Sequence, residues 1–231
     1  MLILALDTSS PAGSLAILRD EKVIGVVSTW AEETYSARMF RHLEFLLREL
    51  SLDLKQFDLF AVAAGPGSFT GLRVGLTAVK GWAEVYKKPA VGVSGLEAIA
   101  TQAHSAAPLL IPILDARRGQ IYFGFYRRGE NGLAVEGEEC VMTPSEFLDA
   151  LNARGAECEF TMVTPEPEII SAKVSHIEKG ATSIERVSSV LAPLIGQLGY
   201  QRVQHGQLSD ALSLDANYVR RTDAELHWKT P

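Results

Sequence analysis

Short apolar runs bounded by charged or turn-forming residues recur through the first half of the chain. Runs of this length predict β-strands, and they are expected at residues 2–7, 13–19, 22–30, 57–64 and 90–93. Apolar positions spaced three and four apart predict helices at residues 34–50, 70–86 and 94–104. Three strands followed by alternating helices and strands predict an α/β fold.

The same order of elements begins again after Pro108. Strands are expected at residues 109–115, 120–127, 133–142 and 159–164. Helices are expected at residues 144–154 and 183–197, the second of them interrupted near Pro193. The period is about half of the chain, which is too long for a solenoid and fits the duplication of one α/β domain.

Residues 63–77 form the most distinctive stretch of the chain. Gly65 and Gly67 permit a tight turn, so a strand is expected to lead directly into a helix here. Ser68 or Thr70 can cap the free N–H groups at the helix start. A Walker loop would carry a lysine near its end, and a Rossmann turn would follow the first strand. The stretch is therefore predicted to be a turn rather than a phosphate-binding loop.

The helix at residues 70–86 has two apolar stripes. One suits a helix that covers a sheet and consists of Leu72, Leu76, Val79, Ala83 and Tyr86. The other contains Gly71, Gly75, Ala78, Trp82 and Val85. Each interior glycine weakens a helix by about 1 kcal/mol relative to alanine, so two in one stripe indicate a close neighbour. That neighbour is a helix of the same chain, or a helix of another chain with Trp82 as anchor.

Composition narrows the classes of function. The chain has 231 residues, of which 47% are apolar and 22% charged, and a net charge of −6. This is an ordinary globular composition, and the negative charge argues against strong autonomous binding to nucleic acid. Cys140 and Cys158 lack metal-like spacing and fit a reduced compartment. Without a signal-peptide pattern or a membrane-length apolar run, the expected compartment is the cytoplasm.

Four motifs together resemble one family. They are Asp7-Thr8-Ser9, the stretch at residues 65–75, Asp115-Ala116-Arg117-Arg118-Gly119, and Tyr218-Val219-Arg220. Over nearly its whole length the chain is similar to the TsaB (YeaZ) family, and the long central motif is highly specific. The resemblance implies two actin-like (ASKHA) lobes, each a ribonuclease-H-like sheet with helices. One lobe would contain residues 1–106, completed by residues 206–231, and the other residues 107–205.

The same resemblance implies a role in tRNA modification. The chain would be a subunit of the bacterial complex that installs threonylcarbamoyl on the adenosine 3′ of the anticodon in tRNA. Family members form homodimers through their first two helices and use the same helices to pair with the catalytic subunit TsaD. The ATPase TsaE completes the complex, tRNA is reached only indirectly, and no membrane is involved.

The resemblance places the partner interface on the helices at residues 34–50 and 70–86. Its expected residues are Tyr35, Met39, Leu43, Gly71, Val74, Gly75, Ala78 and Trp82. Family members commonly carry a histidine in place of Tyr35 and an acidic residue in place of Ala37, so particular contacts differ here. Gly75→Leu is expected to weaken assembly while the isolated chain stays folded.

Two strand ends carry the residue types that an actin-like ATPase uses to hold phosphate and Mg²⁺. By the resemblance, Asp7, Thr8 and Ser9 are phosphate-loop remnants of the first lobe, and Asp115 and Arg117 are remnants of the second. An arginine at this place either binds phosphate or fills the pocket. Ordinary strand-end turns are the favoured interpretation, so neither a catalytic residue nor a cofactor is expected. An active ASKHA-type ATPase or kinase is the alternative.

A metal-dependent peptidase is a less favoured alternative. Catalytic relatives of this fold bind a metal through two histidines four residues apart, and residues 93–99 contain no histidine. His104 has no second histidine near it in the sequence, and a lone histidine is more often a surface or capping residue than a metal ligand. Ser68 and Thr70 have no histidine or aspartate at an interpretable offset for nucleophilic catalysis. No metal site is expected.

Overall fold

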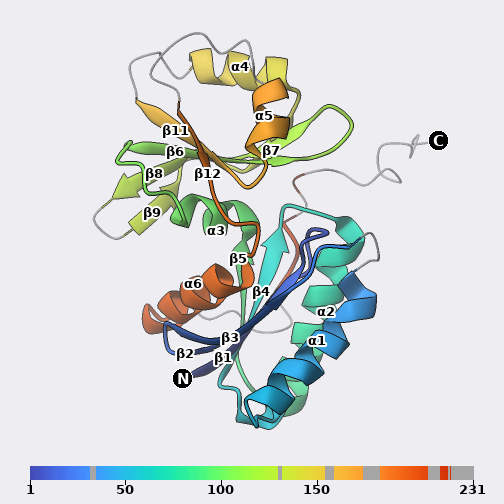
Figure 1. Ribbon diagram of the computed structural model, residues 1–231. Helices are drawn as coiled ribbons and strands as arrows, with labels where there is room; N and C mark the ends of the chain where they lie inside the picture. Colours follow the sequence, from blue (N-terminus) through green and yellow to red (C-terminus); the bar gives the residue numbers. More distant parts are fainter. Residues whose placement is uncertain are drawn as a thin grey trace, which may run out of the picture. The chain divides into compact units, whose positions relative to one another are not determined.

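The computed structural model describes residues 1–31, 35–129, 132–153, 159–173, 183–207, 214–217 and 219. The chain divides into two compact units, each built on its own sheet (Figure 1). The first unit comprises Met1–Gln102 and Ser188–Asn217, and the second comprises Ala103–Val187 and Tyr218–Pro231.

The first unit contains a five-stranded sheet. Its strands are β1 (Leu2–Asp7), β2 (Ser14–Arg19), β3 (Lys22–Ser28), β4 (Leu59–Gly65) and β5 (Ala90–Ser94). They lie in the order β3-β2-β1-β4-β5. The first three strands form an antiparallel meander, and β4 and β5 run parallel to β1. Every residue of β1 is buried, because both faces of the central strands are covered.

Helices lie on both faces of this sheet (Figure 1). One face carries α1 (Tyr35–Glu49) and α2 (Phe69–Tyr86), which contact each other, and the other face carries α6 (Ala192–Gln204). The short helices η1 (Leu54–Gln56) and α3 (Gly95–Thr101) precede β4 and follow β5.

The helix stripes predicted for the first sheet are confirmed. α2 turns four apolar residues to the core, Leu72, Leu76, Val79 and Ala83. On the opposite face, α6 approaches the sheet at Gly196, where a Cβ atom would lie 2.3 Å from the Leu18 side chain. The first sheet therefore has an apolar layer on each side.

The second unit repeats this arrangement. Its main strands are β6 (Leu109–Asp115), β7 (Ile121–Phe123), β10 (Cys140–Met142), β11 (Phe160–Thr164) and β12 (Ser183–Arg186). Their order is β10-β7-β6-β11-β12, with β7 and β10 antiparallel and β11 and β12 parallel to their neighbours. This is the topology of the first sheet, so the predicted duplication of a ribonuclease-H-like lobe is confirmed.

A hairpin distinguishes the second sheet from the first. β8 (Tyr126–Gly129) pairs with the start of β6 and with β9 (Gly132–Val135). The strands predicted at residues 120–127 and 133–142 are each split in two, because β7 and β10 pair at one end of the sheet and the hairpin at the other. The helices α4 (Pro144–Ala153) and α5 (Pro167–Lys173) complete the unit. The ring of Phe147 in α4 packs edge-on against that of Phe123, with the ring centroids 4.8 Å apart.

The helix predicted at residues 183–197 is wrong at both ends. Residues Ser183–Arg186 form β12, and the helix in this part of the chain is α6. Pro193 lies in the first turn of α6, where a missing N–H loses no helical hydrogen bond. It therefore begins the helix rather than interrupting it.

The unit boundary differs from the expected one for the same reason. Because α6 packs on the first sheet, the segment Ser188–Asn217 belongs to the first unit. The sequence predicts that residues up to 205 belong to the second lobe. Asn217 donates its N–H to the Ala64 carbonyl at 2.7 Å. Most of residues 206–231, including Tyr218 and Arg220, lie outside the described residues.

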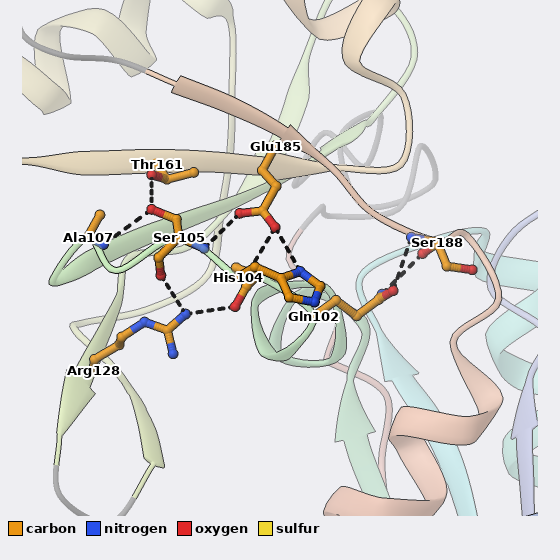
Figure 2. Close-up of polar contacts among 9 residues, drawn as sticks. Gln102, His104, Ser105, Ala107, Arg128, Thr161, Glu185 and Ser188 are labelled. Atoms are coloured by element: carbon orange, nitrogen blue, oxygen red, sulfur yellow. Dashed lines mark hydrogen bonds and ion pairs between the residues drawn. The ribbon is translucent and has the colours of Figure 1, made fainter.

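Polar contacts hold the segments at the margin of each unit (Figure 2). In the first unit, the Gln102 amide and the backbone of Ser188 exchange two hydrogen bonds of 3.1 and 3.0 Å. In the second unit, the Glu185 carboxylate accepts the backbone N–H groups of His104 and Ser105 at 2.8 and 3.1 Å. Among the described residues, no helix is long and apolar enough to cross a membrane.

Candidate functional site

The turn after β1 packs against the start of α2. Asp7 Oδ1 accepts hydrogen bonds from the N–H and the hydroxyl of Ser9, at 2.9 and 2.6 Å. The Thr8 hydroxyl donates to the Gly71 carbonyl at 2.7 Å, and the Ser68 N–H donates to the Ser9 carbonyl at 2.8 Å. Asp7, Thr8 and Ser9 are all buried. These side chains are therefore engaged in a turn of the chain itself.

Ser68 is the residue that caps α2. Its hydroxyl oxygen accepts the Gly71 N–H at 3.3 Å, while Thr70 lies inside the first turn with an exposed side chain. Of the two capping residues that the sequence left open, the structure selects Ser68.

Three glycines let α2 and its leading turn come close to the β1 turn. A Cβ atom on Gly67 would lie 2.6 Å from Ser9 Cβ, and one on Gly71 would lie 2.1 Å from the Thr8 carbonyl oxygen. A Cβ atom on Gly75 would lie 2.5 Å from Thr8 Oγ1. The close neighbour of the glycine stripe is therefore a loop of the same chain. This packing contradicts the expectation that Gly75→Leu would leave the isolated chain folded.

The described residues at this turn do not fit a magnesium–nucleotide, the group that an actin-like fold implies. Asp7 has no exposed surface, and the hydroxyls of Thr8 and Ser9 donate within the chain. The turn packs directly against the start of α2, where even a Cβ atom on Gly71 would lie 2.1 Å from the Thr8 carbonyl oxygen. In the described part of the chain, no three His, Cys, Asp or Glu residues gather where they could hold a metal ion.

Asp7 is buried at a cost to stability. Burial raises the pKa of its carboxyl above the ordinary value, and the two hydrogen bonds from Ser9 oppose that rise. Its second oxygen, Oδ2, has no hydrogen-bond partner among the described residues. A buried charge without a full set of partners destabilises the folded state.

We predict that Asp7→Asn stabilises the protein at alkaline pH. A raised folded-state pKa means that folding favours the protonated form, so the stability of the parent chain falls as pH rises through that pKa. Asparagine keeps an oxygen for Ser9 and carries no charge. Urea unfolding should show a gain of about 1–3 kcal/mol at pH 8 and little difference at pH 4. A loss of similar size at pH 8 would instead indicate a cation paired with Asp7.

The corresponding strand end of the second unit has the same local bond but a different exposure. Asp115 Oδ1 accepts the Arg117 N–H at 2.8 Å, as Asp7 accepts that of Ser9. Arg117 Nη1 lies 3.8 Å from Asp115 Oδ2, and its side chain is 69% exposed. Both aspartates therefore support strand-end turns, and Arg117 projects outward instead of filling a pocket.

The predicted interface residues on α1 belong to the core. Tyr35, Met39 and Leu43 are buried, and the Tyr35 ring occupies the space beside Gly13. The Tyr35 hydroxyl lies 3.1 Å from His42 Nδ1. Burial raises the pKa of Tyr35 and lowers that of His42, so both side chains are favoured in their neutral forms. In the isolated chain these residues therefore fix the position of α1 on the sheet.

A different set of apolar residues on the two helices stays exposed or partly exposed. Phe40 is 60% exposed and Val85 is 72% exposed, and Gly81 has open space where a side chain would begin. We call this set the α1–α2 outer surface, and it consists of Phe40, Phe45, Phe69, Val74, Ala78, Gly81, Trp82 and Val85. Of the predicted interface residues, only Val74, Ala78 and Trp82 belong to it, all of them partly buried.

Comparison with known proteins decides the family. Residues 15–191 match the model of a family described as TsaD, tRNA N6-adenosine threonylcarbamoyltransferase. The chain is also 38% identical to the Bacillus subtilis tRNA threonylcarbamoyladenosine biosynthesis protein TsaB, over 99% of this chain and 98% of that protein. The chain belongs to the TsaB (YeaZ) family. It also falls within the wider TsaD family that the model describes.

Solved structures agree with the TsaB-family fold. A Pseudomonas aeruginosa protein described as similar to peptidase YeaZ superposes with a TM-score of 0.76, at 24% identity, over 95% of this chain and 99% of that one. Component A of Acidaminococcus fermentans (R)-2-hydroxyglutaryl-CoA dehydratase has a TM-score of 0.53 at 9% identity, over 88% of this chain and 99% of that one. The two actin-like lobes expected from the sequence are therefore confirmed.

Sequence reasoning missed part of the exposed surface of α1 and α2 in this TsaB-family chain. Phe45 is not among the residues expected at the interface, although the helical pattern that buries Met39 and Leu43 turns it outward. The pattern that buries Leu76 and Val79 likewise turns Gly81 of α2 outward. The signal for Gly81 lay in its position, four residues beyond exposed Thr77 and four before exposed Val85.

Proposed function

We propose that this chain is a non-catalytic subunit of the complex that makes N6-threonylcarbamoyladenosine in tRNA. It forms a homodimer, pairs with TsaD and supports TsaD together with the ATPase TsaE. It meets tRNA through these partners and works in the cytoplasm, where the tRNA is. The observation that carries this proposal is the 38% identity, over nearly the full length of both chains, to a protein named for this pathway.

The state of the turn after β1 supports the non-catalytic part of the proposal. Catalysis on a nucleotide needs groups that can reach phosphate or a metal ion. Asp7 is instead fully buried, and the Thr8 hydroxyl donates to the backbone of α2. The side chains of this turn are therefore buried in the first unit, where a substrate does not reach them.

The α1–α2 outer surface supports the proposed pairing. Aromatic residues are enriched in protein interfaces, and Phe40 is an exposed aromatic residue of this surface. Val85 adds exposed apolar area that a partner can cover. Gly81 weakens α2 by about 1 kcal/mol relative to alanine. Unlike Gly71 and Gly75, it has no close neighbour in the described chain. Close approach of a partner helix accounts for a glycine at this place.

Reconstitution with purified proteins tests the function. Unmodified tRNA, ATP, threonine and bicarbonate would be supplied with the remaining enzymes of the pathway, and the modified nucleoside would be counted by mass spectrometry. We expect modification with TsaD, TsaE and this chain present, and a loss of at least tenfold when this chain is omitted. Unchanged modification without it would contradict the proposal.

The alternative activities give distinct results on the isolated chain. An active ATPase or kinase would bind Mg-ATP tightly and saturably in calorimetry, and a metallopeptidase would carry stoichiometric metal in elemental analysis. We expect neither result. Tight nucleotide binding or turnover by the chain alone would replace the proposed role with an enzymatic one.

A further inference from the structure

The tip of the β6–β7 hairpin has an unusual backbone. Arg117, Arg118 and Gly119 have φ angles of 62°, 52° and 74°, so three successive residues lie in the left-handed region. For residues with a side chain this conformation costs roughly 1–2 kcal/mol each, and glycine, asparagine and aspartate are the residues that usually occupy it. Two consecutive arginines there indicate that the side chains serve a purpose other than the turn.

The tip is held in this shape by bonds of the hairpin itself. Asp115 Oδ1 accepts the Arg117 N–H at 2.8 Å, and the Gln120 N–H donates to the Arg117 carbonyl at 3.0 Å. The Ala116 N–H donates to the Gln120 carbonyl at 3.1 Å. The strained backbone is therefore fixed at several points, and the two guanidinium groups are attached to a rigid base.

The tip lies beyond the last paired residues of β6 and β7, Asp115 and Ile121. β11 pairs with β6 as far as Pro112, whereas β6 continues to Asp115 and pairs there with β7. Arg117, Arg118 and Gly119 are exposed, and nothing lies within 4 Å of a Cβ atom built on Gly119. An exposed hairpin tip of this kind does not enclose a small ligand, which needs a concave site.

We propose that this hairpin tip, residues 117–119, binds phosphodiester groups of RNA. Guanidinium groups bind phosphate oxygens bidentately, and exposed arginines on a rigid turn contact a nucleic-acid backbone without reading its sequence. The identity of the RNA as tRNA rests on the proposed function. The inference goes beyond that function by giving this chain a direct contact with the tRNA that its partners hold.

The test uses the full-length chain labelled with ¹⁵N and an unmodified tRNA anticodon stem–loop at low salt. Amide signals of residues 116–120 are expected to shift, and added salt should reverse the shift because phosphate contacts release counterions. Arg117→Ala combined with Arg118→Ala should remove these shifts. In the complex with TsaD, the same double variant should weaken tRNA binding roughly tenfold and lower its log–log salt slope by about 1.5.

Arg118→Gly separates binding from structure. Glycine accepts a φ of 52° without strain, so this variant is expected to raise the melting temperature by about 2–4 °C while weakening RNA binding. A side chain with only a structural role would not show this opposition. Arg19→Ala, an exposed arginine of β2 in the first unit, is the matched control and should change neither reading.

Two NMR results would overturn the inference: shifts confined to residues outside the tip, or shifts at the tip with Mg-ATP but not with RNA. Two binding results would also overturn it. One is a double variant that binds tRNA as tightly as the parent chain, and the other is a set of variants that weaken pairing with TsaD and leave RNA binding intact. Gel filtration with TsaD is read separately. If the parent chain fails to pair but RNA shifts the tip, the proposed function fails and the inference stands. If pairing succeeds and the tip does not respond, the inference alone fails.

Discussion

Gly71→Ala is expected to destabilise the first unit by about 3 kcal/mol or more. The new methyl carbon would lie 2.1 Å from the Thr8 carbonyl oxygen, which is backbone and cannot turn aside as a flexible side chain can. Relief of this clash requires α2 to move away from the β1 turn. Such a movement breaks the hydrogen bond from the Thr8 hydroxyl to the Gly71 carbonyl. Urea unfolding followed by circular dichroism measures the loss.

Gly81→Ala is the matched control on the same helix. No described atom lies within 4 Å of the Cβ position at Gly81, so alanine brings only its better helix propensity and should stabilise the chain by about 1 kcal/mol. If Gly71→Ala lowers the free energy of unfolding and Gly81→Ala raises it, then Gly71 packs against the interior of the unit and Gly81 does not. A Gly71→Ala protein as stable as the parent would contradict the packing described for α2.

Phe40→Asp and Val85→Asp are expected to weaken pairing with TsaD, and self-association, by about 30- to 100-fold each. Both side chains are exposed in the isolated chain, so a charge there leaves folding stability within about 0.5 kcal/mol. At the centre of an interface the same charge loses apolar contact and is buried without a partner, which typically costs 2 kcal/mol or more. Analytical ultracentrifugation and surface plasmon resonance measure the two associations.

Val135→Asp provides the control for these variants. Val135 is a valine of β9 in the second unit, 47% exposed, and the same chemical change there should leave both associations at the parent value. If Phe40→Asp and Val85→Asp pair as tightly as the parent chain, the partner surface lies elsewhere and the α1–α2 outer surface has no role in assembly.

Much of the fold could be predicted because apolar periodicity determines which faces of the elements are buried. The runs at residues 2–7 and 109–115 became β1 and β6 with the expected bounds, since continuous apolar runs of this length suit central strands. The helix at residues 183–197 was mispredicted because β12 is short and only half-buried, so its pattern is weak. Pro193 was read as an interruption, but a proline can also begin a helix.

The candidate sites were harder to predict because a residue type does not determine its neighbour. A glycine stripe on α2 indicates a close approach, and only the fold shows that Gly71 and Gly75 face Thr8 while Gly81 faces solvent. Likewise, the sequence leaves open whether Arg117 binds phosphate or fills a pocket. Its left-handed backbone and exposed side chain depend on the hairpin turn, which apolar periodicity does not describe.

The central claim is that this chain supports modification of tRNA by binding TsaD, not by chemistry at its own strand ends. The most direct measurement is the rate of threonylcarbamoyladenosine formation in the reconstituted system with three forms of the chain. Asp7→Asn is expected to restore the parent rate, whereas Phe40→Asp should lower it at least tenfold at limiting concentration and recover as its concentration rises. An inactive Asp7→Asn protein that still pairs with TsaD, or a fully active Phe40→Asp protein that does not pair, would contradict the claim.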